Sequence, residues 1–191
     1  ALVENNTITK YFSYPKGFTL GDLQYPADIF TKWSVEEKEA IGIHEVVFDN
    51  SNFKDEQWYI NTNQSFAFAN GTVTASYGTA TAKAHADVTE TINGVELTTP
   101  GLKTNLIKNL KTNVANELAK TDWYITRNTE KSTAIPSAIS THRDAVRTKQ
   151  ASMETAITNA SDTLAIEALY TYTTTDGVQS RPLGELPVLE S

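Results

Sequence analysis

The chain has 191 residues, a net charge of −7 and no cysteine, and 39% of its residues are hydrophobic. Without cysteine it forms no disulfide, no catalytic thiolate and no cysteine-based zinc site. The negative charge argues against a nucleic-acid surface, because nothing in the sequence offers a dense lysine or arginine stripe. No apolar run reaches the length that spans a bilayer. A chain of this length makes one ordinary domain or two small ones.

The N-terminal part of the sequence predicts a strand followed by two short helices. Residues 6–12 (NTITKYF) alternate in polarity and favour a strand. Pro26 suits the first turn of a short helix carrying Ile29, Phe30 and Trp33. The next helix is expected to begin at Ser34, because Ser34 and Glu37 have the spacing of a capping box.

Two Asn-Gly pairs predict hairpins further along the chain. Residues 44–50 (HEVVFDN) and 57–78 favour strands, and Asn70-Gly71 lies between two alternating runs. Asn-Gly favours a type I′ turn, because both turn positions need a positive φ. The second pair, at 93–94, predicts another small hairpin. Residues 79–90, between the two, are expected to be a linker or a loose edge.

The pattern changes to helices after Pro100-Gly101. Apolar residues then recur every four positions, which predicts one face of a helix: Leu106, Leu110, Val114 and Leu118. A second helix is expected to start at Pro136, which the first turn tolerates, and to carry an apolar stripe: Ile139, Val146 and Met153. Ser161 and Asp162 predict the cap of a last short helix ending near Tyr170.

Together these elements predict an α+β fold. We expect a small β-rich part over residues 1–84, a linker or hairpin over 85–100 and an antiparallel helical hairpin over 101–170. Residues 171–191 have little periodicity, so we expect an extended tail that is ordered only against a neighbour.

The sequence offers no recognisable set of catalytic or metal-binding residues. Its three histidines, His44, His85 and His142, fall in three different predicted elements. No zinc-protease, calcium-loop or phosphate-loop motif is present. His85 and Asp87 could share a metal, but an exposed histidine is the favoured interpretation. We therefore predict no enzyme, no cofactor and no metal.

Residues 121–149 suggest a braced helical hairpin. Arg143 and Arg147 are one helical turn apart and share a face. We expect Trp123 to plug the end of the hairpin. Asp122, placed in the connecting loop, is expected to pair bidentately with one of the two arginines.

Aromatic residues gather near the N-terminus: Tyr11, Phe12, Tyr14, Phe18 and Tyr25. They could form a platform that stacks on sugars, but a thin β core needs such residues for its own burial. Core or interface is the favoured interpretation. Tyr14, Phe18, Tyr25 and Trp33 are the interaction candidates of this region.

Several segments also carry a resemblance to phage proteins. TDWYITR (121–127), AIP (134–136) and HRDAVR (142–147) resemble the C-terminal helical region of tail-assembly or tail-fibre-assembly proteins of tailed bacteriophages. His142 stands where that pattern often has Tyr, and Val146 where it often has Leu. Residues 14–34 and 40–50 are similar, more loosely, to uncharacterised structural proteins of marine cyanobacterial phages.

The resemblance implies a non-enzymatic role in a phage virion, which would be assembled in the host cytoplasm. It implies a place in the tail, at a fibre attachment or at the baseplate. The implied partners are other tail or fibre proteins, in a homo-oligomer or around a ring, with no nucleic acid and no membrane. Two alternatives stay open: a tail-fibre assembly chaperone absent from the mature particle, or a carbohydrate-binding module of the virion.

Overall fold

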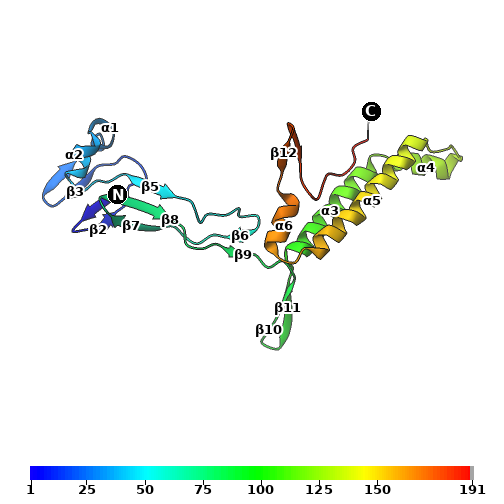
Figure 1. Ribbon diagram of the computed structural model, residues 1–191, viewed down its shortest axis with the longest axis horizontal. Coiled ribbons are helices and arrows are strands. Elements are labelled where there is room, and N and C mark those ends of the chain that lie inside the picture. The colour runs from blue at the N-terminus through cyan, green and yellow to red at the C-terminus, as the bar shows by residue number, and fades with distance from the viewer. Residues whose placement is uncertain (190–191) are drawn as a thin grey trace. The chain divides into compact units, whose positions relative to one another are not determined.

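A computed structural model describes residues 1–189 and shows an α+β protein (Figure 1). The chain divides into a first unit, residues 1–81, and a second unit from residue 82 onwards. None of the helices in residues 1–189 combines the length and hydropathy needed to cross a membrane.

Short antiparallel strand pairs and two short helices begin the first unit: β1 (Leu2–Glu4), β2 (Thr7–Lys10), β3 (Phe18–Leu20), β4 (Leu23–Tyr25), α1 (Ile29–Lys32) and α2 (Val35–Glu39). The predicted capping box of α2 is confirmed, because Ser34 N donates to Glu37 Oε2 at 2.8 Å and Glu37 N donates to Ser34 Oγ at 3.2 Å. Pro26 lies before α1 rather than in its first turn, and Asp28 is the N-cap.

A small core joins these elements. Leu2, Phe18, Ile29 and Ile43 are buried together. Gly42 returns the chain to β1, where Val3 N donates to the Gly42 carbonyl at 2.8 Å. Gly42 has φ +81°, and a Cβ there would lie 2.4 Å from the Val3 carbonyl oxygen, so only glycine fits this approach.

A three-stranded sheet completes the first unit, in the order β5 (Val46–Asp49), β8 (Thr72–Ser76), β7 (Ser65–Ala69). β5 and β8 are parallel, and β7 and β8 are antiparallel. The predicted Asn70-Gly71 turn is confirmed, with φ of 52° and 77°. A separate two-stranded ladder pairs β6 (Tyr59–Ile60) with β9 (Thr81–Ala82).

The second unit begins with a hairpin of β10 (Val88–Ile92) and β11 (Val95–Thr99) around the predicted Asn93-Gly94 turn. Residues 79–90 were expected to be a linker or a loose edge, and they contain β9 and the start of β10. The linker interpretation is wrong from Val88 onwards, because the β-branched residues of β10 pair along the whole of β11. Asp87 fixes the base of the hairpin: its Oδ1 accepts from Gly101 N at 2.8 Å and from Thr104 Oγ1 at 2.6 Å.

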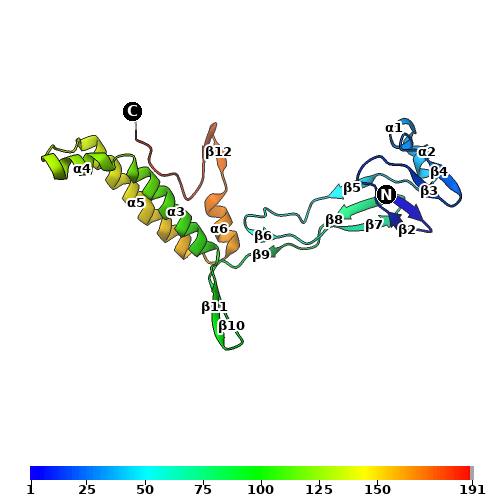
Figure 2. The same ribbon diagram turned by 180° about the vertical axis from the view of Figure 1, so that it is seen from behind.

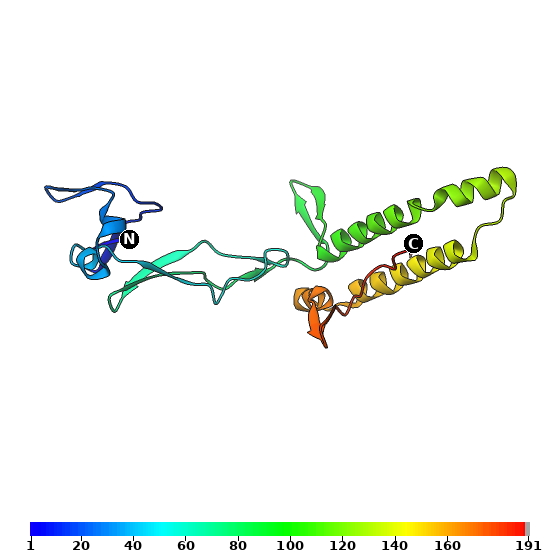
Figure 3. The ribbon, with the colours of Figure 1, turned by 90° about the horizontal axis from the view of Figure 1, so that it is seen from above.

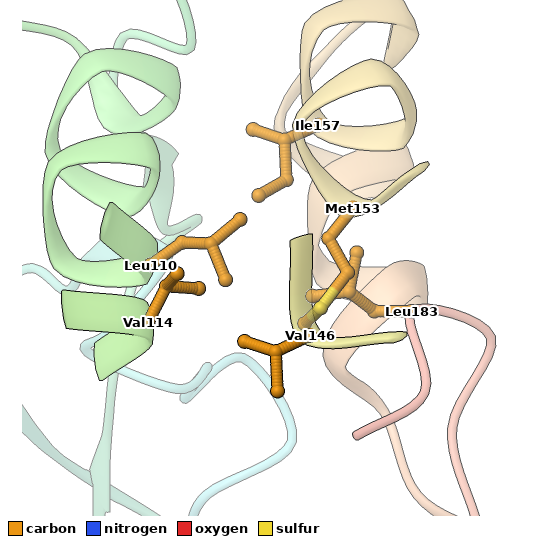
Figure 4. Packing of buried hydrophobic residues seen from close by; sticks show 6 residues of the cluster. All are labelled: Leu110, Val114, Val146, Met153, Ile157 and Leu183. Atoms are coloured by element: carbon orange, nitrogen blue, oxygen red, sulfur yellow. The ribbon is translucent and has the colours of Figure 1, made fainter. Parts of the chain in front are cut away.

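Four helices follow: α3 (Leu102–Ala119), α4 (Asp122–Lys131), α5 (Ser137–Asn159) and α6 (Thr163–Tyr170). α3 and α5 run antiparallel beside each other (Figure 3). Their seam buries a cluster of apolar side chains (Figure 4): Leu110, Val114, Val146, Met153, Ile157 and Leu183. Asp162 caps α6 as predicted, since its Oδ1 accepts from Ala165 N at 2.7 Å.

The expectation of an extended tail is wrong for residues 173–180. β12 (Thr173–Thr175) and β13 (Val178–Ser180) form a hairpin, and Asp176 and Gly177 turn it with φ of 52° and 78°. Beyond the hairpin, Leu183 is buried in the helical core, and its N–H donates to the Leu169 carbonyl at 3.0 Å. The tail is therefore ordered against the chain's own helices.

Candidate interaction site

A buried arginine joins three helices at the end of the helical pair. Arg143 of α5 has a side chain only 10% exposed, and its Nη1 is close to three oxygens. It donates to the Leu118 carbonyl at 2.8 Å, to Thr121 Oγ1 at 2.7 Å and to Asp122 Oδ1 at 2.8 Å. Since Nη1 carries two hydrogens, the three acceptors share them. The arginine thereby satisfies a carbonyl at the end of α3 and ties it to the start of α4.

The predicted pairing of Asp122 with an arginine is present, and Arg143 is that arginine. Two details of the expectation are wrong. Asp122 is the first residue of α4 rather than part of a loop, where its charge favours the helix N-terminus. The ion pair also forms through Nη1 and Oδ1 rather than bidentately. Arg147 instead contacts Asp144 at 3.2 Å on an exposed face.

Trp123 does not plug the hairpin, because its side chain is 52% exposed. As the second residue of α4 it faces outwards and contacts Tyr124, with ring centroids 3.8 Å apart. The Arg127 guanidinium lies over both rings, 4.7 Å from the Trp123 centroid and 5.3 Å from that of Tyr124. Positions three and four residues apart share a helix face, so α4 stabilises its own aromatic surface by cation–π contact.

A second polar cluster beside Arg143 was not predicted. His142 Nε2 lies 3.3 Å from Glu117 Oε1, with both side chains nearly buried. The Lys120 ammonium donates to the other oxygen of Glu117. This hydrogen bond, helped by the charges of Lys120 and His142, holds the pKa of the Glu117 carboxyl below its usual value. Glu117 of α3 and His142 of α5 thus lie against each other across the helix pair, although Glu117 Oε1 and His142 Nε2 make no hydrogen bond within residues 1–189.

The aromatic candidates of the first unit mostly pack against one another. Phe18 is buried, and Tyr25 stacks on it with centroids 5.2 Å apart. Trp33 meets Tyr25 edge-on at 6.0 Å, and Phe12 lies 5.0 Å from Phe18. Tyr11 and Tyr14 are open, at 50% and 63% exposed. Phe18, with Tyr25 and Trp33 packed against it, therefore belongs to the core.

The β10–β11 hairpin was predicted from Asn93-Gly94, but its exposed surface was not. Every residue of both strands is exposed, and the ribbon extends away from the start of α3 (Figures 1 and 2). Residues directly opposite each other share a face, and the register pairs Val88 with Thr99, Glu90 with Leu97 and Ile92 with Val95.

One face of this hairpin is consequently apolar. We call it the hairpin face; it consists of Val88, Glu90, Ile92, Val95, Leu97 and Thr99. Its four aliphatic side chains are 41–68% exposed. The opposite face is polar, with Thr89 and Thr98 joined by a hydrogen bond of 2.8 Å. Counting residues outwards from Asn93-Gly94 would have predicted this segregation, because the turn fixes the register.

Chemistry of other kinds has little support in the described part of the chain. Residues 1–189 contain no group of three or more histidine, aspartate or glutamate side chains placed to hold a metal ion. Of the His85 and Asp87 pair, the Asp87 Oδ1 atom accepts hydrogen bonds at the start of α3.

The chain matches no protein-family model, no curated protein and no solved structure at a significant level. Among the chain's own surfaces, the hairpin face carries four aliphatic side chains that are 41–68% exposed.

Proposed function

We propose that the chain is a non-enzymatic structural component of a bacteriophage virion, associated with the tail, a fibre attachment or the baseplate, and that it acts by binding other proteins. The observation that carries this proposal is the hairpin face, with four exposed aliphatic side chains on one side of a two-stranded ribbon. The resemblance of residues 121–147 to tail-assembly and tail-fibre-assembly proteins gives the setting.

The hairpin face is expected to pack against another surface, for a physical reason. A two-stranded hairpin alone in water is marginally stable, and it becomes stable when an apolar face packs on something. Completing the burial of Val88, Ile92, Val95 and Leu97 would contribute about 1 kcal/mol for each half-exposed side chain, or about 4 kcal/mol in all. Ordering and association costs offset much of that gain. The hairpin face is therefore one contact among several, as in an assembled particle.

The charge of the hairpin selects the kind of partner. Glu90 is the one charged residue on the hairpin face, and residues 84–102 contain no lysine or arginine. A second copy of this face would bring like charges together. A different protein that offers an apolar surface with a lysine or arginine opposite Glu90 fits better. Any homo-oligomer or ring would then use other surfaces of the chain.

A matched pair of charge reversals tests this docking. Glu90→Lys places a cation on the hairpin face, and Glu96→Lys makes the same change on the polar face of the same ribbon. We expect Glu90→Lys to lower incorporation of the chain into purified phage particles by at least tenfold, and Glu96→Lys to leave it unchanged. Equal incorporation of both variants would remove the hairpin face as the docking surface.

A mass-spectrometric inventory of purified particles tests the wider proposal. We expect the chain in fixed stoichiometry with tail or fibre proteins. Recovery from infected cells together with absence from mature particles would overturn the structural role and favour a tail-fibre assembly chaperone.

A further inference from the structure

The first unit contains a pocket that the docking proposal does not use. Its volume is about 550 Å³, within the range of small-molecule sites. Five aromatic rings line it: Tyr11, Phe12, Phe30, Phe48 and Phe66. All the lining residues belong to residues 1–66, so the pocket lies wholly within the first unit.

Two of these rings come from the three-stranded sheet. Phe48 of β5 and Phe66 of β7 both pair with Ala75 of the central strand, so the two rings stand on the same face on either side of a methyl group. Strands are about 4.8 Å apart, which puts the two Cα atoms about 10 Å apart.

The aromatic walls are unusually open. Phe48 is 63% exposed, Tyr11 is 50% exposed and Phe66 is 36% exposed. Tyr11 braces Phe66, with ring centroids 4.5 Å apart. Open aromatic rings clustered around a concavity are typical of ligand-binding surfaces rather than of a folded core.

Polar side chains of both signs line the same pocket: Ser13, Lys38, Glu45 and Gln64. Across residues 1–189, none of these four side chains takes part in a hydrogen bond or ion pair within the chain. A hydroxyl, an ammonium, a carboxylate and an amide are thus all open to a ligand, and together they supply donors and acceptors.

We propose that this pocket binds a saccharide, most simply a mono- or disaccharide unit of a surface glycan. The C–H face of a pyranose ring carries partial positive charge and packs on the negative face of an aromatic ring. Its hydroxyl groups need both donors and acceptors, which Lys38, Gln64 and Glu45 supply. A fatty acid would match the walls and Lys38, but it would leave the Glu45 carboxylate beside a second carboxylate.

The proposal differs from the sugar platform considered from the sequence. Of the aromatic residues near the N-terminus, Tyr11 and Phe12 line the pocket, whereas Phe18 and Tyr25 belong to the core. Phe48 and Phe66 come from strands much later in the chain. The glycan site is also independent of the hairpin face, so either proposal can fail without the other.

Binding is tested with the full chain on a glycan array, followed by saturation-transfer NMR titration of the best disaccharide found. Phe48→Ala should weaken that binding by at least tenfold. Val47→Ala is the matched control: Val47 is the neighbouring residue of β5, is 53% exposed and points to the opposite face. It should leave the affinity unchanged. Tryptophan fluorescence, dominated in this unit by Trp33 and buried Trp58, checks that each variant is folded.

Gln64→Leu separates the saccharide from an apolar occupant. A saccharide should lose at least fivefold in affinity when the amide is removed, because its hydroxyl then lacks a partner. Decanoate and a phenylalanine-containing peptide serve as apolar probes. An array without signal, binding that Phe48→Ala leaves intact, or an apolar probe that binds more tightly to Gln64→Leu would each overturn the proposal.

Discussion

The two Asn-Gly hairpins of this chain are nearly identical locally and opposite in their surroundings. β7–β8 and β10–β11 each have strands of five residues and turns with almost the same φ angles. In the first, Val73 and Ala75 are completely buried, because β8 is the central strand of a sheet. In the second, every residue is exposed.

Formation of a hairpin and burial of its faces therefore depend on different parts of the sequence. Turn chemistry and β-branched residues suffice to form both ribbons and to segregate their faces. Burial requires a further element, and only β7–β8 receives one from within the described chain, the parallel strand β5. We interpret the hairpin face as a surface whose cover belongs to another protein.

The largest expected effect comes from breaking the base of β10–β11. Gly101→Ala would put a Cβ 2.3 Å from the backbone C and O of Ala86, where neither chain segment can move away cheaply. We expect a loss of about 3 kcal/mol, seen in far-UV circular dichroism as early melting of the helical unit. Gly71→Ala is the comparison without a clash, because its Cβ meets nothing within 4 Å and only its φ of +77° adds strain of about 1 kcal/mol. Equal melting temperatures of the two variants would show that Gly101 does not lie tightly against the backbone of Ala86.

The next largest difference is expected between the stability losses caused by truncating one valine in each hairpin. Val73→Ala removes a fully buried side chain from β8, whereas Val95→Ala removes one that is 68% exposed from β11. We expect about 2 kcal/mol for Val73→Ala from lost transfer energy and a residual cavity. Val95→Ala should cost less than about 0.5 kcal/mol. Urea denaturation followed by tryptophan fluorescence for Val73, and by circular dichroism for Val95, measures both.

A large effect of Val95→Ala in the isolated chain would contradict the comparison. It would mean that the hairpin face is already covered by the chain itself, or by a second copy. Repeating the measurement over a range of protein concentrations separates these two cases, since only self-association makes stability depend on concentration.

Local signals explain most of what the sequence predicted correctly. The capping box at Ser34, the Asn-Gly turns and the Asp162 cap depend on residues at most a few positions apart. The apolar spacing of α3 and α5 likewise indicated the seam between them. The α+β class followed from these elements.

Contacts between distant residues explain the errors. The tail was expected to need a neighbour, because nothing near Leu183 signals that it packs between helices more than a few residues away in the chain. Trp123 was expected to plug the end of the hairpin from the connecting loop, but it lies in the first turn of α4 and is exposed. At the candidate site, the Asp122–Arg143 pair could be foreseen from charge, whereas the role of the Leu118 carbonyl could not.

Alanine in place of either turn glycine should add the same backbone strain, but the effect on stability should differ between the two hairpins. Gly71 and Gly94 have φ of +77° and +80° and open space around their Cβ positions. The strain of an L-residue there is about 1 kcal/mol in each case. Gly71→Ala should lower the stability of the first unit by that amount. Gly94→Ala should instead open β10–β11 locally, raising hydrogen exchange at residues 88–99 and leaving the helices unaffected.

The informative comparison is hydrogen exchange at residues 88–99 in Gly94→Ala and in the unsubstituted chain. If Gly94→Ala left the exchange of residues 88–99 unchanged, the ribbon would have more support than its own ladder and base provide. A bound partner should have the same protective effect, and its addition would restore slow exchange in the variant.

The smallest expected effect is a pH response confined to β10–β11. The Thr104 hydroxyl and, next, the Gly101 N–H donate to Asp87 and hold its pKa below the usual value. Folding therefore favours the carboxylate, so its contribution is complete above the unfolded pKa of about 3.9 and is lost as the pH falls through the lower folded value. Protection of hairpin amides should decline in that acid range, and Asp87→Asn should remove the decline.

Asp49→Asn, in the sheet that contains β7–β8, provides the matched control. Asp49, at the end of β5, also has a lowered pKa, because Ser51 donates to it through its side chain and its N–H. That contact is local and fixes no hairpin base, so the acid response of residues 88–99 should survive this substitution unchanged. A response lost in Asp49→Asn but kept in Asp87→Asn would place the acid-sensitive contact elsewhere, and the hairpin would then be held by something other than its junction with α3.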